Sequence, residues 1–305
     1  MPDKPAAEVA IDEPLIRGLL AEQASDVIPD AQTRPLSLAE AGWDCEMWRL
    51  GDDLAVRMPR RAVAAKLVVH EHEVVPTLAR LIAPSVVGVP APLVRGLPSG
   101  GYPWHWSVVP WFDGASALSV RRAERTPWAA DLARALRLMH VEAPAEHPVN
   151  PFRGVPLADR DEAVEARLAS LRARRAAPED QLDAGHELWR AAVAAPVHSG
   201  RPVWVHGDLH PGNLVADAGR LAAIIDFGDV TAGDPAYDLA VAWLAFDAAG
   251  RERFIAMLAD RHDADAWTRA RGWAVAVAAM LLDHSDDNPE YAALGAEALA
   301  EVTAR

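Results

Sequence analysis

Two short polar segments carry residues whose types and spacing could move a phosphate. The first, 206–214, reads His-Gly-Asp-Leu-His-Pro-Gly-Asn-Leu and contains Asp208 and, five residues later, Asn213. The second, Ile225 to Asp229, places Asp226 directly after an apolar run. Phosphoryl transfer needs one carboxylate for the attacking hydroxyl, and an amide and a second carboxylate to hold Mg²⁺ against the phosphates. Because positioning does most of the work in this reaction, three such groups around one phosphate would suit it.

Together, the two segments resemble the catalytic loop and metal-binding motif of the aminoglycoside phosphotransferase family, which includes macrolide phosphotransferases and is related to choline kinases. The resemblance implies that Asp208 is the catalytic base or orients the hydroxyl, and that Asn213 and Asp226 bind Mg²⁺. It also implies that His206 supports the loop and that ATP or GTP is the phosphate donor. Asp, Asn and Gly are common in ordinary turns, but two motifs in the right order between short strands favour the catalytic interpretation.

A third segment, Gly233 to Ala240, also resembles the family, in which it opens a helix after the metal motif. Asp234 followed by Pro235 has the form of a helix N-cap with proline at the first helical position. We expect a structural role for this segment, with Asp238 tying the helix to the catalytic loop.

The cation that usually contacts the α- and β-phosphates in kinases is a lysine on the third strand. Here the corresponding strand, Leu54-Ala55-Val56-Arg57-Met58, offers Arg57. An arginine binds as a planar fork, whereas lysine acts as a point charge. We predict Glu73 on the following helix as the partner of Arg57, with Glu71 as second choice. Lys66 is a rival cation, although its place in a helical pattern favours a solvated side chain.

Two further segments indicate where a nucleotide would bind. The stretch Trp106 to Gly114 resembles the family's hinge, which implies that the Pro110 carbonyl and the Phe112 N–H hold the base. The tryptophans at 104, 106 and 111 favour core packing between two lobes over a ligand site. The turn 41–46 occupies the place of the loop over the phosphates, where Cys45 could equally be a packing residue.

These segments need elements to position them, and the apolar spacing changes along the chain from strand-like to helical. The first part predicts a leading helix, three antiparallel strands, a long helix and an aromatic strand: Ile11–Ala24, Leu36–Gly42, Glu46–Leu50, Leu54–Met58, Ala62–Ile82 and Trp104–Phe112. The rest predicts helices with three short strands around the polar turns: Trp128–His140, Leu157–Arg174, Asp180–Ala194, Val203–Val205, Asn213–Val215 and Leu221–Ile225, with helices again from Pro235. This layout is an α+β, bilobal protein-kinase-like fold, with a nucleotide-binding lobe at 1–112 and a helical lobe with the catalytic loop and acceptor site at 113–305.

Composition excludes several other classes of protein. The chain has 305 residues, a formal net charge of -14 and one cysteine, which argues against disulfides and thiolate metal sites. Net negative charge argues against a nucleic-acid partner. The acidic N-terminus is unlike a secretory signal, and the apolar stretch Gly272 to Leu282 is too short to cross a bilayer. We therefore expect a cytoplasmic protein without a membrane partner; the oligomeric state is left open.

The sequence predicts a small-molecule kinase that phosphorylates a hydroxyl, and leaves the acceptor open. The named candidates are an aminoglycoside or macrolide antibiotic, which would make the enzyme a resistance factor. Carboxylates late in the chain could attract a cationic acceptor, and two tryptophans could pack on an apolar one: Asp263, Asp265, Asp283, Asp286, Asp287 and Glu290, and Trp267 and Trp273. The alternatives are a metabolic kinase for choline, homoserine or a sugar, and a nucleotide-binding pseudokinase that serves as an interaction module.

Overall fold

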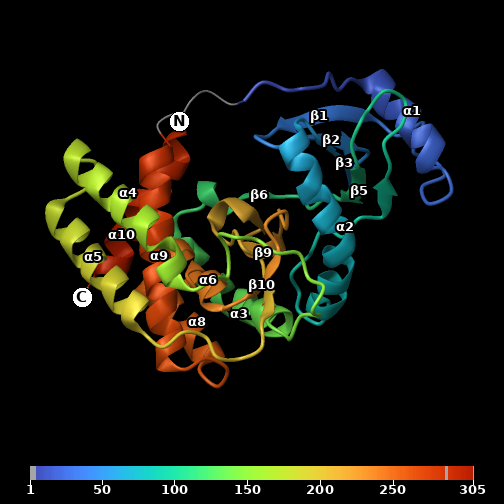
Figure 1. Ribbon diagram of the computed structural model, residues 1–305. Helices are drawn as coiled ribbons and strands as arrows, with labels where there is room; N and C mark the ends of the chain where they lie inside the picture. Colours follow the sequence, from blue (N-terminus) through green and yellow to red (C-terminus); the bar gives the residue numbers. More distant parts are fainter. Residues whose placement is uncertain (1–4, 286–287, 305) are drawn as a thin grey trace.

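A computed structural model describes residues 5–285 and 288–304 of the chain. The chain forms an N-terminal region built on an antiparallel sheet and a C-terminal region made mostly of helices (Figure 1). The α+β fold class predicted from the sequence is therefore confirmed.

The N-terminal sheet has five strands in the order β1-β2-β3-β5-β4, and every neighbouring pair is antiparallel. Its strands are β1 (Leu36–Ala41), β2 (Cys45–Leu50), β3 (Leu54–Pro59), β4 (Val94–Gly96) and β5 (Trp106–Pro110). Gly51 adopts a φ of +68° in the turn between β2 and β3, a conformation that glycine tolerates best. Sequence analysis missed β4, a three-residue edge strand that follows a proline-broken stretch.

Two helices accompany this sheet. The first, α1 (Glu13–Gln23), begins after Asp12, whose side chain accepts a hydrogen bond from the Leu15 backbone N–H at 2.9 Å. It buries its apolar side in the core beneath the sheet. The second, α2 (Ala62–Ile82), has the predicted bounds. Its C-terminal half contributes Val75, Leu78 and Ile82 to the core of the C-terminal region, so α2 links the two regions.

The C-terminal region is organised around the long helix α9, which contacts α10, α5, α4 and α6. The helices are α3 (Ala129–Met139), α4 (Asp161–Arg174), α5 (Glu179–Ala194), α6 (Ala236–Leu239), α7 (Val241–Ala245), α8 (Ala248–Leu258), α9 (Ala264–His284) and α10 (Pro289–Thr303). The helix predicted at Leu157–Arg174 divides into a 3₁₀ turn (Leu157–Arg160) and α4. Gly272 allows α5 to approach α9 closely, since a Cβ there would lie 2.2 Å from the Ala192 side chain.

The short strands β7 to β10 lie between α5 and α6 and hold the polar turns of interest, and β6 joins them from an earlier part of the chain. One small sheet has the order β6-β8-β9, with β6 (Ala115–Ser116), β8 (Leu214–Asp217) and β9 (Arg220–Ile224). The other pairs β7 (Val203–Val205) with β10 (Thr231–Gly233). Sequence analysis missed β10, a three-residue strand with one β-branched residue. Within residues 5–285 and 288–304, no helix is both long and apolar enough to cross a bilayer.

Candidate active site

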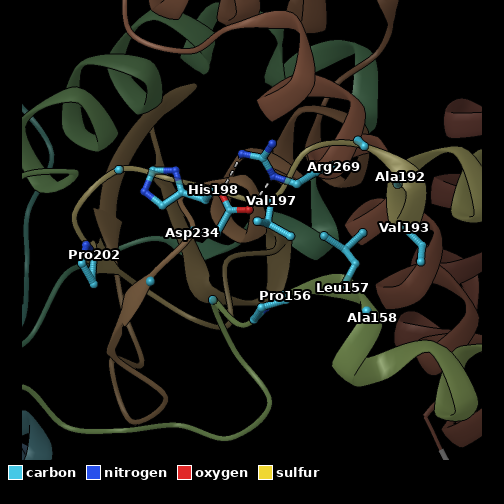
Figure 2. A pocket seen from close by; sticks show the side chains of 14 residues that line it. Pro156, Leu157, Ala158, Ala192, Val193, Val197, His198, Pro202, Asp234 and Arg269 are labelled. Atoms are coloured by element: carbon cyan, nitrogen blue, oxygen red, sulfur yellow. Dashed lines mark hydrogen bonds and ion pairs between the residues drawn. The ribbon is translucent and has the colours of Figure 1, made fainter.

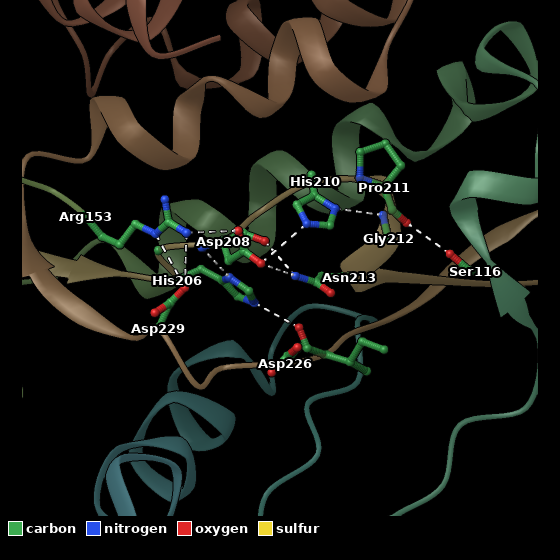
Figure 3. Close-up of polar contacts among 12 residues, drawn as sticks. Ser116, Arg153, His206, Asp208, His210, Pro211, Gly212, Asn213, Asp226 and Asp229 are labelled. Atoms are coloured by element: carbon green, nitrogen blue, oxygen red, sulfur yellow. Dashed lines mark hydrogen bonds and ion pairs between the residues drawn. The ribbon is translucent and has the colours of Figure 1, made fainter. Parts of the chain in front are cut away.

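The loop after β7 is joined to the segment after β9 by a buried histidine (Figure 3). The His206 Nδ1 accepts a hydrogen bond from the Asp208 backbone N–H at 3.2 Å, so Nε2 carries the proton and donates to the Ile225 carbonyl at 3.0 Å. Gly207 has a φ of +84°, and a Cβ there would lie 2.3 Å from the Asp229 carbonyl oxygen. The geometry thus supports the loop-supporting role predicted for His206 and requires glycine beside it.

Asp238 fastens this loop to α6. Its carboxylate is fully buried and accepts hydrogen bonds from the backbone N–H groups of His206 at 2.8 Å and Gly207 at 3.1 Å. The His140 Nε2 lies 3.1 Å from the same carboxylate. These contacts make the link between α6 and the loop that the sequence predicted. Asp234 accepts a hydrogen bond from the Ala236 N–H, but α6 begins at Ala236, so Pro235 precedes the first helical position.

Asp208 has different partners on its two carboxylate oxygens. The Asn213 Nδ2 donates to Oδ2 at 3.1 Å and to the Asp208 backbone carbonyl at 2.8 Å, and the His210 Nε2 lies 3.4 Å from Oδ2. Oδ1 lies 3.7 Å from the Arg153 Nη2. Burial raises the pKa of Asp208, but His210, Arg153 and His206 outweigh it and hold the pKa well below its usual range. Asp208 is therefore an anion suited to orienting a hydroxyl.

Asp226 is the second residue of the second motif, just after β9, and has an exposed side chain and an unusual backbone conformation. Its φ is +61°, a left-handed value that aspartate adopts more readily than most residues. The Arg57 Nη2 lies 3.1 Å from its Oδ1. The Asn213 Nδ2 donates hydrogen bonds to Asp208, and the Oδ1 of Asn213 is the other terminal atom of the same amide group. Asp226 and Asn213 thus offer oxygen ligands of the kind that Mg²⁺ uses together with substrate phosphates.

Arg57 also forms an ion pair with Glu71 on α2. The Arg57 Nε lies 3.0 Å from the Glu71 Oε2, and both side chains are largely buried. Burial raises the pKa of Glu71 to about 7, although the charge of Arg57 lowers it. The first choice for this partner, Glu73, was wrong: it is exposed, because residues two apart on a helix point in nearly opposite directions. Lys66, the rival cation, is also exposed.

A cavity of about 660 Å³ brings most of these residues together. Its lining contains Arg57, Asp208, Asn213 and Asp226, the hinge residues Pro110 and Phe112, and residues of the turn between β1 and β2. Trp111 also lines it, whereas Trp106 is fully buried in the N-terminal core. Cys45 lines this cavity too, yet burial raises its pKa to about 12, which fits a packing residue. The cavity therefore joins the predicted nucleotide site to the catalytic loop.

One part of the cavity wall is acidic. Among the described residues, its lining includes the carboxylates of Glu40, Asp44, Glu71, Asp208, Asp226 and Glu290. Burial, together with the charges of Asp208, Asp226, Glu40 and Glu290, raises the pKa of Tyr291 to about 12. The Tyr291 ring packs edge-on against His210, with 5.5 Å between the ring centroids. This wall suits a cation, either Mg²⁺ or an amine of the acceptor.

The other acceptor candidates lie apart from this wall. Trp273 is buried and packs against Trp189 and Tyr237, so it belongs to the core. Asp263 caps α9, and Asp283 accepts a hydrogen bond from Ser170. Trp267 packs against the same core, and Asp265 is exposed on α9. The predicted residues Asp286 and Asp287 lie outside the described residues.

Sequence reasoning missed Arg153, His210 and Tyr291 as members of the site. His210 belongs to the first motif, where its fixed spacing from Asp208 was the available signal. Arg153 lies in the segment between α3 and α4 and is brought to Asp208 only by the fold. Tyr291 comes from the first turn of α10. Neither has a local sequence pattern that marks it.

A second, smaller cavity of about 220 Å³ is lined by residues at the end of β10 and by residues of α5 and α9 (Figure 2). The buried ion pair of Asp234 and Arg269 lies at its wall, with 2.6 Å between Oδ2 and Nε. Its remaining wall is mainly apolar and includes Leu157, Val193 and Val197. Arg269 also donates to the Pro196 carbonyl at 2.7 Å. This pair ties α9 to the strand next to the catalytic loop.

The two-part fold, the hinge strand and the Asp–Asn–Asp arrangement define a phosphotransferase of kinase-like fold. The model of the phosphotransferase enzyme family matches residues 35–273, and the chain belongs to that family.

Several solved structures share the fold. The GDP and kanamycin complex of APH(2'')-IIIa is 20% identical, with a TM-score of 0.64 and coverage of 92% of this chain and 97% of that one. ADP-bound aminoglycoside phosphotransferase APH(2'')-Ib is 16% identical, with a TM-score of 0.60 and coverage of 96% and 99%. Macrolide 2'-phosphotransferase MphH from Brachybacterium faecium is 22% identical, with a TM-score of 0.56 and coverage of 87% and 91%. At these identities the likeness establishes the fold.

Proposed function

We propose that this enzyme transfers the γ-phosphate of ATP or GTP, with Mg²⁺, to a hydroxyl of a small amine-bearing acceptor, with an aminoglycoside as first candidate and a macrolide as second. The observation that carries the proposal is that Asp208, Asn213 and Asp226 line one cavity with Arg57 and the hinge. Family relatives crystallised with GDP or ADP support a nucleotide donor.

In this proposal the nucleotide base lies against the hinge, with Pro110 and Phe112 providing backbone groups. Arg57, steadied by Glu71, contacts the phosphates. Asn213 and Asp226 would hold Mg²⁺, and the ion would neutralise phosphate charge during transfer. In the structure Arg57 forms an ion pair with Asp226, so the carboxylate assigned to Mg²⁺ already has the positively charged guanidinium of Arg57 as a neighbour.

Asp208 orients the acceptor hydroxyl toward the γ-phosphorus. The acceptor oxygen forms a bond to phosphorus, the bond to the leaving diphosphate oxygen breaks, and the hydroxyl proton passes to the Asp208 carboxylate. Because the surroundings of Asp208 keep its pKa low, it is a weak base, and proton transfer belongs late in the reaction, after the oxygen–phosphorus bond has begun to form.

The acidic wall supports the choice of acceptor. Glu40 and Glu290 line the cavity beside Tyr291, and ammonium groups placed there would meet negative charge at short range. Kanamycin, the ligand of one relative, is an aminoglycoside. A macrolide with one amine would use less of this wall, so we rank it second.

Mass spectrometry of acceptor mixtures tests the proposal. The enzyme is incubated with Mg²⁺ and either ATP or GTP, and with kanamycin, a macrolide, choline, homoserine or a sugar; one phosphoryl group adds about 80 Da. A product on kanamycin or the macrolide, lost with EDTA, supports it. Transfer only to choline, homoserine or a sugar would indicate a metabolic kinase. Magnesium-dependent nucleotide binding in calorimetry without any turnover would indicate a pseudokinase.

A further inference from the structure

The guanidinium group of Arg153 lies beside Asp208 and faces the carboxylates of Asp208 and Asp229 (Figure 3). Its Nη2 lies 3.7 Å from the Asp208 Oδ1 and 3.3 Å from the Asp229 Oδ2. The side chain is 20% exposed, and it is absent from the lining of the 660 Å³ cavity, whereas Asp208 is part of that lining. Arg153 therefore contacts Asp208 from outside the lining of this cavity.

Arg153 is itself held in place by several contacts. Its Nη1 donates to the Tyr237 hydroxyl at 2.6 Å, and the guanidinium carbon lies 5.4 Å from the centre of the Tyr237 ring. The carboxylate that Arg153 shares, Asp229, accepts a hydrogen bond from the Asn150 Nδ2 at 2.9 Å. The Gly154 carbonyl accepts a hydrogen bond from the Asp234 N–H at 2.9 Å, which fixes the backbone beside Arg153. The cation is thus part of a rigid network.

The two oxygens of the Asp208 carboxylate have different neighbours. Asn213 and His210 approach Oδ2, while Arg153 faces Oδ1. At 3.7 Å, the contact with Arg153 is an ion pair and is longer than a hydrogen bond. It therefore fixes the orientation of Oδ1 without taking a lone pair in the way that a hydrogen bond would. That oxygen can then accept the hydrogen bond of an incoming hydroxyl.

We propose that Arg153 is a positioning residue for phosphoryl transfer, which holds the Asp208 carboxylate toward the acceptor and separates it from Asp229. This inference rests on the proposed function. Without the guanidinium, the carboxylates of Asp208 and Asp229 would face each other unshielded, and repulsion would turn Asp208 away from the acceptor. Arg153 stays protonated throughout and exchanges no proton.

Substitution of Arg153 should separate kcat from KM. We expect Arg153→Met to lower kcat about a hundredfold, the scale of a small misplacement of a reacting group. The KM values for nucleotide and acceptor should stay within about twofold, because Arg153 is not among the residues that line the cavity proposed to hold them. Arg153→Lys should recover part of kcat, since lysine restores the charge but not the planar fork. Arg160→Met is the matched control, because Arg160 stacks on Phe152 in the same segment, and it should keep both constants.

A second substitution distinguishes positioning from simple support of the fold. Asp229→Asn removes the carboxylate that would repel Asp208, so in the Arg153→Met background it should raise kcat again. If Arg153 only braced the segment, the double variant would lose a further contact and kcat would fall. If Arg153→Met does not fold, Arg153→Lys takes its place: kcat should fall about tenfold at unchanged KM and should rise when Asp229→Asn is added.

Urea unfolding provides a readout that needs no acceptor. The free energies of unfolding of Arg153→Met, Asp208→Asn and the double variant should be non-additive, because the two side chains contact each other. Additive values, or a kcat of Arg153→Met equal to that of Arg160→Met, would overturn the inference. If the wild type phosphorylates no acceptor, the proposed function fails, and the unfolding cycle alone decides whether Arg153 supports Asp208.

Discussion

The two carboxylates at the centre of the site differ in their surroundings. Asp208 is largely enclosed by His210, Asn213 and Arg153, with 28% of its side chain exposed. The Asp226 side chain is 49% exposed and forms an ion pair with Arg57. A carboxylate held on several sides is suited to orienting one hydroxyl, whereas an open one can take a metal ion and phosphates. The two side chains should therefore respond differently to substitution.

We expect Asp208→Ala to abolish transfer while nucleotide affinity stays nearly intact, since this residue should touch the acceptor and not the phosphates. Asp226→Ala should weaken magnesium-nucleotide binding and also lower the rate about a hundredfold or more, because it removes a metal ligand. Isothermal calorimetry with Mg²⁺ and nucleotide, alongside a transfer assay, measures both effects. The reverse result, with binding lost only in Asp208→Ala, would exchange the two roles.

The neighbouring glutamates of α2 provide a matched pair for testing the phosphate cation. Glu71→Ala should raise the nucleotide KM and lower kcat, because Arg57 loses the partner that steadies it. Glu73→Ala should leave both constants unchanged, because Glu73 is exposed. Steady-state kinetics with varied nucleotide provides the comparison. In the double variant Arg57→Ala/Glu71→Ala, the losses should be less than additive, and additive losses would show that the two residues act independently.

At the scale of single residues, the sequence identified site residues that lie close together in a motif. It did not identify residues that only the folding of the chain brings to the site. Asp208 and Asn213 lie on one short loop, so their proximity follows from their spacing. The choice between Glu71 and Glu73 depends on the rotation of α2, which is set by the packing of side chains such as Val75 and Leu78. Arg153 reaches Asp208 through a segment without regular structure, and no periodicity could place it.

Among the elements, long ones with strong periodicity were predicted well. The bounds of α2 agree at both ends, since apolar residues repeat along its whole length. The short strands β4 and β10 were missed because three residues give too little alternation to detect. Both are defined by their partners, β5 and β7, and not by their own sequence. These two strands therefore form because they pair with strands elsewhere in the chain, which a local sequence pattern does not reveal.

A buried hydrogen bond connects α2 to the sheet and should make stability depend on pH. The His72 Nε2 lies 2.8 Å from the Ser107 Oγ on β5. Burial, together with the charges of His105 and Arg95, lowers the pKa of His72 to about 4. The folded state thus holds His72 neutral where the unfolded chain, with a pKa near the usual value of about 6.5, binds a proton.

The unfolding free energy should therefore be unaffected by His72 above about pH 6.5 and fall between about pH 6.5 and 4, by on the order of 3 kcal/mol. His72→Gln keeps a hydrogen-bonding side chain near Ser107 but does not titrate in this range. Urea unfolding at a series of pH values should show a shallower acid loss for His72→Gln than for the wild type. Equal slopes for the two proteins would mean that protonation of His72 is not coupled to unfolding.

For the molecule as a whole, negative charge is in excess in the last third of the sequence, and some of it lines the cavity. The chain carries a net charge of -14, and residues 206–305 contain seventeen acidic and seven arginine residues. Part of this excess lies on the cavity wall, at Asp208, Asp226 and Glu290. A negative cleft attracts amines and repels a bare nucleotide, so under the proposed function the same charge would favour a cationic acceptor and a nucleotide that enters with a metal ion.

Ionic strength tests this view of the whole charge distribution. Raising it from about 0.01 M to 0.1 M shortens the screening length from about 30 Å to 10 Å, so the KM for kanamycin should rise several-fold while kcat changes little. Glu290→Gln should reduce this salt dependence because it removes a carboxylate from the cavity wall. Glu252→Gln, which removes an exposed charge on α8, should preserve it. Equal salt dependence in the two variants would mean that net charge, and not the wall beside Tyr291, attracts the acceptor.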